Sequence, residues 1–399
     1  ISLDNLTYAG IENPLGGTFN NASAITIGAN AGVGLYGIQN LAAFNNNTGG
    51  QIRVDRSTHA GIYNQSSIFT NEAVITIGAN AGVGFYGIQN LASFNNSPGG
   101  QVSVDRSNNS GIYNLDGTFN NAASITIGAE TSVGAEGIRN NAAFINSACA
   151  VLTNFAPVVN WNTFTNAGLF TSSTTGSHTN NSTLTNNGII AYPQGNPIPN
   201  VTNNEIIIAP TTSSNCQSVS PAFALGNPVD FTIQGIYSDA NATLSAGTFD
   251  QGANTFTPSP ALSDDEMYNY YVKIEDGIGG CTRTVPWQVT VHDDTPPTAG
   301  CQDITVSLDG NGNAAILPAD VFDGGTDNCG TANPQNVSPD EFSCAHLGAN
   351  TVTLTVSDGN GNTNTCTATL TVQDDTPPTA TCQDITVSLD GNGNAAILP

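Results

Sequence analysis

The sequence predicts an all-β protein, a right-handed parallel β-helix (solenoid) followed by tandem Ig-like β-sandwich domains. Three observations support this fold class. A spacing of 25 residues runs through the first part of the chain, short alternating segments are separated by Gly and Asn turns, and a block of 81 residues begins to repeat near the C-terminus. Internal periods of roughly 20–50 residues are typical of solenoids and repeated modules.

The β-helix is predicted over residues 1–209. Phenylalanines recur every 25 residues, at Phe19, Phe44, Phe69, Phe94, Phe119 and Phe144. About 25 residues with two or three short strands make one coil of a parallel β-helix, and successive coils pair about 4.8 Å apart. These phenylalanines are therefore expected to form an inward structural ladder.

Asparagines in Gly-Ile-x-Asn segments predict a second ladder, because stacked amides bond to their copies in the coils above and below. They are Asn13, Asn40, Asn64, Asn90, Asn114 and Asn140. Beyond residue 150 the repeat shortens but keeps a Thr-Asn turn, in FTNAGLF, LTNNGII and VTNNEII. The β-helix is expected to narrow and to end near Ala209, where Pro and polar turn residues follow.

The rest of the chain predicts sandwich modules. Residues 210–292 carry two cysteines about 65 residues apart and alternating strands, which is typical of an Ig-like sandwich. DDTPPTAGCQDITVSLDGNGNAAILP from Asp293 recurs almost unchanged from Asp374. The spacing predicts one complete module over 293–373 and the truncated start of the next over 374–399.

Composition limits the partners. Asp and Glu number 31 against 6 Lys and Arg, a formal net charge of -25, so nucleic acid and anionic membranes would be repelled. The sequence shows no signal peptide and no membrane span. Both ends are expected to be cut from a longer chain, with secretion signals outside this stretch.

The string CQDITVSLDGNGNAAILPADVFDGGTDNCG, continued by TVTLTVSDGNGNTNTCTATLTVQDDTPPT, resembles the HYR-like, Ig-fold repeats of very large secreted Bacteroidota proteins. The likeness is close over 293–399 and loose over 210–292, while the N-terminal half is similar to filamentous-adhesin β-helices. It implies a giant secreted surface adhesin exported by type IX secretion. The layout is similar to that of an extracellular hook or tether of a gliding, predatory marine filamentous bacterium.

Eight cysteines without metal-site spacing imply an oxidising compartment, hence an extracellular or cell-surface location. The logic of the modules pairs Cys216 with Cys281, Cys301 with Cys366 and Cys329 with Cys344, and leaves Cys382 to a partner beyond the chain. Cys149 has no counterpart in the repeat. A buried, hydrophobe-like thiol is expected there rather than an inter-chain disulfide.

The chain is predicted not to be an enzyme, and no catalytic residue is proposed. Glycan-cleaving β-helices need clustered carboxylates, but Asp55-Arg56 and Asp105-Arg106 recur at the same point of successive blocks, which favours surface ion pairing. The four histidines follow no partner pattern, and no GxSxG, HExxH or phosphate loop occurs.

No cofactor is predicted, and calcium is the single candidate, because hard cations bind several oxygen ligands. The candidate metal ligands are Asp309, Asn311, Asn313, Asp320, Asp323, Asp327, Asp358, Asn360 and Asn362. The alternative is that the DGNGN segments are turns alone, since DG and NG are strong hairpin signals and the loops lack the final Glu of an EF-hand.

The leading interpretation is an extracellular structural or adhesion protein, a rigid filament or stalk for cell-surface attachment or cell-cell contact. The alternative is a carbohydrate-binding or polysaccharide-processing β-helix displayed on an Ig-like stalk. Uniform ladders favour the rod, and a unique, non-repeated polar cluster on one face of the β-helix favours the alternative. Solitary Trp161 and Trp287 give a carbohydrate platform little support. A homo-oligomer or self-assembling filament is expected, with other cell surfaces or glycans as further partners.

Overall fold

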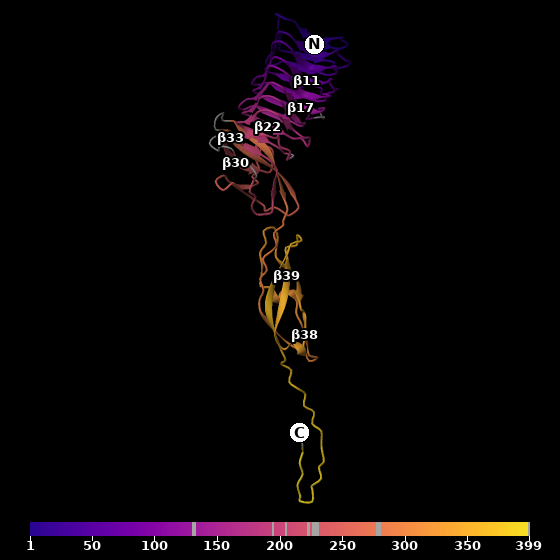
Figure 1. Ribbon diagram of the computed structural model, residues 1–399, viewed down its shortest axis with the longest axis vertical. Coiled ribbons are helices and arrows are strands. Elements are labelled where there is room, and N and C mark those ends of the chain that lie inside the picture. The colour runs from indigo at the N-terminus through magenta and orange to yellow at the C-terminus, as the bar shows by residue number, and fades with distance from the viewer. Residues whose placement is uncertain are drawn as a thin grey trace. The chain divides into compact units, whose positions relative to one another are not determined.

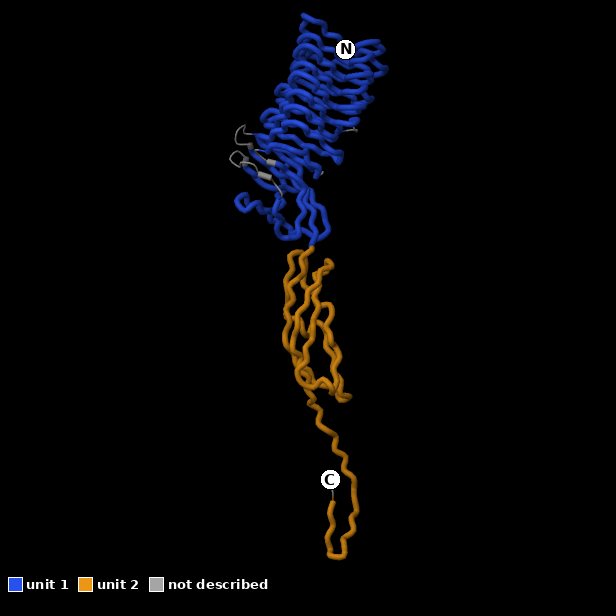
Figure 2. The backbone as a smooth tube through the Cα atoms, in the orientation of Figure 1, with its two compact units in different colours: residues 1–293 blue, residues 294–399 orange. Residues whose placement is uncertain are grey.

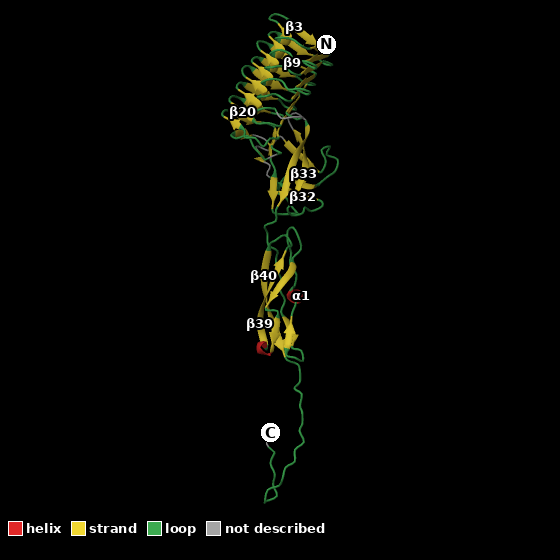
Figure 3. Cartoon of the chain, turned by 90° about the vertical axis from the view of Figure 1, so that its right-hand side faces the viewer, coloured by secondary structure: helices red, strands yellow, loops and turns green. Residues whose placement is uncertain are grey.

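The computed structural model describes residues 1–129, 133–193, 195–203, 206–221, 224–225, 231–276 and 281–397. The chain divides into two compact units, residues 1–293 and 294–399 (Figure 2). Strands dominate the described residues, which contain only a four-residue α-helix and one 3-10 turn (Figure 3). The predicted all-β fold class is confirmed. No helix among these residues is long and apolar enough to cross a membrane.

Three parallel sheets form the β-helix, one strand of each per coil through most of the β-helix (Figure 1). The first sheet contains β1 (Ser2–Leu3), β4 (Ala24–Ile27), β7 (Gln51–Val54), β10 (Val74–Ile77), β13 (Gln101–Val104), β16 (Ser124–Ile127), β19 (Val151–Asn154), β22 (Leu169–Ser172), β25 (Ile189–Ala191) and β27 (Ile206–Ile208). The second contains β2 (Ala9–Asn13), β5 (Tyr36–Asn40), β8 (Ala60–Asn64), β11 (Tyr86–Asn90), β14 (Ser110–Asn114), β17 (Glu136–Asn140), β20 (Val158–Asn160) and β23 (Thr179–Asn180). The third contains β3 (Thr18–Asn21), β6 (Ala43–Asn46), β9 (Ile68–Asn71), β12 (Ser93–Asn96), β15 (Thr118–Asn121), β18 (Ala143–Asn146), β21 (Phe164–Asn166), β24 (Leu184–Asn186) and β26 (Val201–Asn203).

The Gly-Ile-x-Asn segments form the second sheet, and each position has a separate physical reason. A Cβ at Gly37 would lie 2.1 Å from Val54 Cγ1 and 2.5 Å from the Gly61 carbonyl, so this position admits no side chain. Ile38 is fully buried in the core. The x residue, Gln39 in this coil, pairs with Tyr63 of the next coil. The Asn that ends the segment turns its amide into the β-helix interior.

Phenylalanines stack along the third sheet as the 25-residue spacing predicts. From Phe19 to Phe144 adjacent ring centroids lie 4.6 to 5.0 Å apart, and the stack continues to Phe164 at 4.7 Å. The rings are nearly parallel, since interplanar angles between Phe44 and Phe144 are 10° or less. Offset stacking at this separation adds to the free energy gained from burying each ring.

Two buried asparagine ladders run through the β-helix. The predicted one links Asn13 to Asn140 by amide-to-amide hydrogen bonds of 2.7 to 2.8 Å, and continues to Asn180. A second, not predicted, runs from Asn21 to Asn203 at the end of the third sheet. Each amide donates to one neighbouring coil and accepts from the other.

The coils shorten toward the C-terminus, as expected. The asparagine ladder advances by 27, 24, 26, 24 and 26 residues as far as Asn140 and then by 20 to Asn160 and 20 to Asn180. The 25-residue coil is thus an average over two alternating loop lengths. The last parallel strand of the first sheet is β27, followed by the antiparallel strand β29 (Ala224–Leu225).

The VDRS segments hydrogen-bond to loops of the neighbouring coils. The expected surface ion pairing of Asp55 with Arg56 is therefore wrong. Asp55 is fully buried, accepts hydrogen bonds from the N–H groups of Asn80 and Ala81 in the next coil, and pairs with Arg53 at 2.9 Å. Arg56 instead donates to the carbonyls of Gly28 and Ala29 in the preceding coil. The recurrence therefore fastens loops of successive coils together.

The first sandwich follows within the same unit. Its main sheet contains β28 (Thr211–Ser213), β34 (Thr282–Val291), β33 (Met267–Asp276) and β30 (Phe231–Tyr237), and a hairpin joins β31 (Gly247–Asp250) to β32 (Thr255–Pro258). Trp287 is 2 % exposed, packs against Phe256 and Tyr270, and donates to Thr211 Oγ1 at 3.1 Å. The predicted boundary at 209/210 stays a prediction, because residues 1–293 form one unit.

The second unit contains a smaller sandwich. One sheet contains β35 (Ile304–Ser307), β40 (Thr363–Gln373), β39 (Gly348–Ser357) and β37 (Asn333–Ser338), and β36 (Asn313–Ala315) pairs with β38 (Glu341–Ser343). Helix α1 (Pro318–Val321) and the 3-10 turn η1 (Cys344–His346) lie in its connections. Leu308 and Ile316 are buried here, whereas their copies one repeat later, Leu389 and Ile397, are exposed. The described residues after Gln373 contain no strand.

The cysteine pairing differs from the predicted one at two places. Cys301 is bonded to Cys366, as the module logic gives, but Cys281 is bonded to Cys149 and not to Cys216. Cys149 is therefore not the free buried thiol that we expected. Cys344 is exposed and free, so its pairing with Cys329 is wrong. Spacing within a module cannot reveal a bond between a coil and a sandwich, because that contact arises only when the two pack together.

Interrupting the predicted asparagine ladder should destabilise the β-helix. Asn64 donates to Asn90 Oδ1 at 2.7 Å, and Asn90 donates to Asn114 Oδ1 at 2.8 Å. Asn90→Ala leaves both neighbouring amides short of a partner in the core, and we expect the free energy of unfolding in urea to fall by about 2–4 kcal/mol. The exposed Asn108→Ala is the control, with a change within about 0.5 kcal/mol. Equal values for the two variants would contradict the ladder's role.

Lowering the pH should reduce the stability of the shortened coils after residue 150, because His178 is buried there. Burial lowers the pKa of His178, and a hydrogen bond with the backbone of Asn196 opposes this shift only in part. Nδ1 accepts the Val158 N–H at 3.0 Å, which requires an unprotonated ring nitrogen. The unfolded chain therefore binds this proton more readily, so stability is fully present above pH about 6.5 and falls as the pH drops toward the folded-state pKa. Urea midpoints at pH 7.5 and 5.5 should differ less in His178→Gln than in the parent or in the exposed His292→Gln. An unchanged difference in His178→Gln would refute this assignment.

Candidate functional site

Aromatic side chains gather on the outer side of the second sheet. We define the aromatic face as Tyr8, Tyr36, His59, Tyr63, Phe85, Tyr86 and Tyr113. The rings alternate between two strand positions, because the register pairs Tyr36 with Ala60 and Gln39 with Tyr63, and the same order returns in the next two coils. Where one coil has Tyr at the first position, the next has it at the fourth.

The rings of the aromatic face contact one another across coils. Tyr36 stacks on Tyr63 with centroids 4.6 Å apart, and Tyr86 lies 4.9 Å from Tyr113. His59 connects the two tyrosine pairs through edge contacts of 5.6 Å to Tyr36 and 5.5 Å to Tyr86. The result is one continuous aromatic strip along the β-helix rather than isolated surface rings.

The strip remains open to solvent. Tyr8 and Phe85 are 47 % and 54 % exposed, and the other rings are half-buried against their neighbours. This partial burial raises the pKa of Tyr36, Tyr63 and Tyr113. The three phenols therefore stay protonated in neutral solution and can both donate and accept hydrogen bonds.

Polar groups border the aromatic face. Gln39 donates to Gln65 at 3.0 Å and leaves its own buried Oε1 without a partner, while His59 contacts Gln89 Oε1 at 3.1 Å. At the other end, Arg139 lies 5.4 Å from the Tyr113 ring centroid and within 3.5 Å of Glu136. Amides, a guanidinium and a carboxylate thus stand beside aromatic planes.

This arrangement suits ligands that combine an apolar face with hydroxyl groups. Exposed, contiguous aromatic surface usually marks an interaction site, and Tyr provides both apolar area and a polar tip. The two tyrosine pairs are separated by two coils, roughly 10 Å at the spacing of paired strands. A chain of linked sugar rings lying along the strip would meet aromatic planes at regular intervals.

The sequence contained the signal for this face, but it was missed. YGIQN and GIYN alternate in successive coils, which places Tyr at two outward positions of one sheet. From the sequence, the solitary Trp161 and Trp287 were weighed as aromatic binding residues and given little support. In the structure Trp287 is core and Trp161 is 53 % exposed outside the aromatic face, so neither provides a platform.

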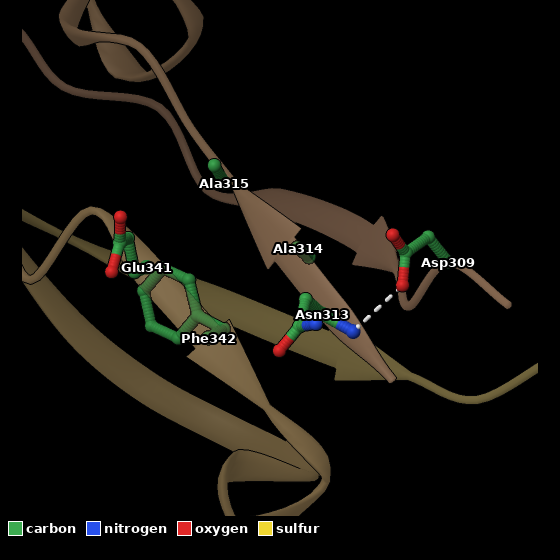
Figure 4. A pocket seen from close by; sticks show the side chains of 6 residues that line it. All are labelled: Asp309, Asn313, Ala314, Ala315, Glu341 and Phe342. Carbon is green, nitrogen blue, oxygen red and sulfur yellow. Dashed lines mark hydrogen bonds between the residues drawn. The ribbon is translucent and has the colours of Figure 1, made fainter. Parts of the chain in front are cut away.

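The predicted calcium ligands are divided among several places in the second unit. Asp309 Oδ1 accepts the N–H groups of Asn311 and Asn313, both at 2.9 Å, and these bonds lower the pKa of Asp309. Figure 4 shows Asp309 beside Asn313 at the rim of a hollow of about 330 Å³, with Glu341 pointing away on its far side. This DGNGN segment is a turn, the alternative that the sequence left open. Asp320 accepts the Leu317 N–H at the start of α1.

Two of the predicted ligands do converge. Asp327 and Asp358 place ligand oxygens within 4.8 Å of each other, and Asp358 is only 4 % exposed. Burial acts to raise the pKa of Asp358, but hydrogen bonds from Asn362, Asn360 and Gly361 outweigh it, so the pKa is lowered and the carboxylate is charged at neutral pH. A second group that could hold an ion, Asp264, Asp265 and His292, lies in the first sandwich and is largely exposed.

No protein-family model matches the sequence, and no curated protein matches it. Solved structures with some likeness include an endo-fucoidan hydrolase of glycoside hydrolase family 107 (17% identity, 43% of this chain, 29% of that chain, TM-score 0.17). Others are human mucin-like protocadherin EC1-2 (18%, 43%, 97%, 0.21) and the human desmocollin-1 ectodomain (15%, 44%, 37%, 0.19). The chain thus spans less than a third of the hydrolase that it matches.

The prediction that the chain is not an enzyme is withdrawn, because the solved structures with some likeness include endo-fucoidan hydrolases of family 107. TM-scores of 0.21 or lower carry no argument for a shared fold, so they transfer no reaction to this chain either. The described residues define the class directly, as a parallel β-helix with an aromatic outer face followed by disulfide-bonded sandwiches.

Proposed function

We propose that this chain is an extracellular carbohydrate-binding β-helix displayed on Ig-like modules. The observation that supports it is the continuous aromatic face, bordered by amides and aligned along the β-helix axis. Sugar rings present C–H faces to aromatic planes and hydroxyls to amide and phenol groups. This is the alternative weighed from the sequence, but the aromatic face is not the unique, non-repeated polar cluster expected for it, because its rings recur with the coils.

The structural role is retained as the support of this surface. Uniform buried ladders make the β-helix rigid, and a rigid scaffold keeps the rings aligned with little loss of conformational entropy on binding. The cysteine bonds Cys149–Cys281 and Cys301–Cys366 favour an oxidising, extracellular compartment. Attachment to a cell surface or another cell through glycans would follow from such binding, and export by type IX secretion remains what the resemblance implies.

The ligand class that we propose is a neutral polysaccharide with exposed C–H faces. The net charge of -25 disfavours sulfated or uronate-rich chains through long-range repulsion. Stacking does not depend on ligand charge, so a neutral β-linked glucan, mannan or xylan loses nothing on approach. Homo-oligomerisation of the β-helix would multiply such weak contacts along one polymer.

Replacing Tyr63 and Tyr113, the tyrosines at the fourth strand position, should weaken polysaccharide binding without disturbing the β-helix. Gln occupies the same register position in adjacent coils, at Gln39 and Gln89, so Tyr63→Gln combined with Tyr113→Gln keeps the strand pattern. Losing two stacking contacts of about 0.5–1.5 kcal/mol each predicts roughly 5- to 150-fold weaker binding to a soluble neutral glucan, mannan or xylan. Affinity electrophoresis or calorimetry would measure it.

Trp161→Gln, an exposed aromatic outside the aromatic face, serves as the control and should bind like the parent. If no neutral polysaccharide binds the parent chain, or if the double variant binds as well as the parent, the proposal fails. Size analysis of the polysaccharide after incubation reports cleavage in the same experiment.

A further inference from the structure

The loops that carry Asp327 and Asp358 lie at the same end of two paired strands, β37 and β39, in the second unit. Asp327 precedes β37 and Asp358 directly follows β39, and these strands pair antiparallel with Asn333 opposite Ser357. The fold therefore brings together two acidic loops that are distant in sequence. Their ligand oxygens lie within 4.8 Å of each other.

Each carboxylate uses only one of its oxygens within the protein. Asp358 Oδ1 accepts the N–H groups of Asn360 at 2.7 Å, Gly361 at 3.1 Å and Asn362 at 3.2 Å. Asp327 Oδ2 accepts the N–H groups of Cys329 at 2.7 Å and Gly330 at 2.8 Å. The turns are thus satisfied by one oxygen from each side chain.

The remaining oxygens, Asp327 Oδ1 and Asp358 Oδ2, are buried and have no hydrogen-bond partner. Buried polar atoms almost always find a partner, and a charged carboxylate oxygen without one is costly. The two carboxylates also repel each other, because they place oxygens within 4.8 Å. A bound cation would remove both costs.

The second unit contains no side chain that could supply this positive charge reliably. Residues 294–399 contain no Lys and no Arg, and their single histidine, His346, lies in η1 and contacts Ser343. Hard oxygen ligands of this kind select Ca²⁺, which accepts irregular sets of carboxylate, carbonyl and water oxygens, over Mg²⁺, which demands an octahedron.

We propose that Asp327 Oδ1 and Asp358 Oδ2 bind a calcium ion that joins the loop before β37 to the loop after β39. The remaining coordination positions are filled by water and by neighbouring amide or carbonyl oxygens. The ion stiffens the edge of the sandwich and neutralises its repelling carboxylates. This inference is independent of the carbohydrate proposal, which concerns the β-helix.

Calorimetry on the whole chain tests the site, with calcium chloride as titrant and with melting scans in calcium or in EDTA. At a calcium concentration of ten times Kd, we expect the melting temperature of the second unit to rise by roughly 5–10 °C. Asp327→Asn and Asp358→Asn should each lose this rise. In EDTA each should melt no lower than the parent, because one of two repelling charges is gone while the turn acceptor remains.

Asp309→Asn is the matched control, because it changes the same DGNGN turn where no second carboxylate converges, and it should keep the full calcium response. Identical melting of the parent in calcium and in EDTA would overturn the site. So would a calcium response that survives in Asp358→Asn but is lost in Asp265→Asn, since that places the ion in the first sandwich.

Discussion

The β-helix depends on one requirement, that each asparagine of the two buried ladders finds a partner in the coil above and in the coil below. An asparagine in the interior is costly unless both its donor and its acceptor are used, and the two ladders use both at each step from Asn13 and from Asn21. A shift of one coil by a single residue would break these bonds and turn the phenylalanine stack outward. The ladders therefore fix the register of all three sheets.

This fixed interior explains why the outer surface can vary. The Gly-Ile-x-Asn segment leaves only x free to change, and x is Glu, Gln, Tyr or Arg in the different coils. Loop length varies as well, because coils of 24 and 26 or 27 residues alternate without disturbing the ladders. Variation confined to outward positions on a rigid frame can place rings at regular intervals, as the aromatic face shows, and it needs no unique loop to do so.

The sequence was sufficient for several features that repeat, although the second asparagine ladder and the aromatic face were missed, and it was insufficient for contacts that occur once. The phenylalanine stack, the first asparagine ladder and the narrowing after residue 150 all follow from spacing. The Cys149–Cys281 bond does not, because it joins a coil of the β-helix to a cysteine 132 residues later, just before strand β34 of the sandwich. Asp55 was expected on the surface because the Asp-Arg pair recurs at the same point of successive blocks, whereas the fold buries Asp55 and bonds it to the next coil's loop. Of the nine proposed calcium ligands, sequence pattern could not separate Asp309, which only closes a turn, from Asp358, because the same DGNGN letters surround both.

The difference between Asp309 and Asp358 shows how the sandwich fold can place the same turn motif beside a second carboxylate, as in the proposed calcium site. Asp309 Oδ1 and Asp358 Oδ1 bond to their loop N–H groups in the same way. Asp309 follows an edge strand and faces solvent, whereas Asp358 follows β39, whose neighbour β37 is preceded by a second acidic loop. Strand adjacency therefore determines whether the spare oxygen of the turn meets water or another carboxylate. In a unit without Lys or Arg, burying two such oxygens is stable only if a cation from solvent accompanies them.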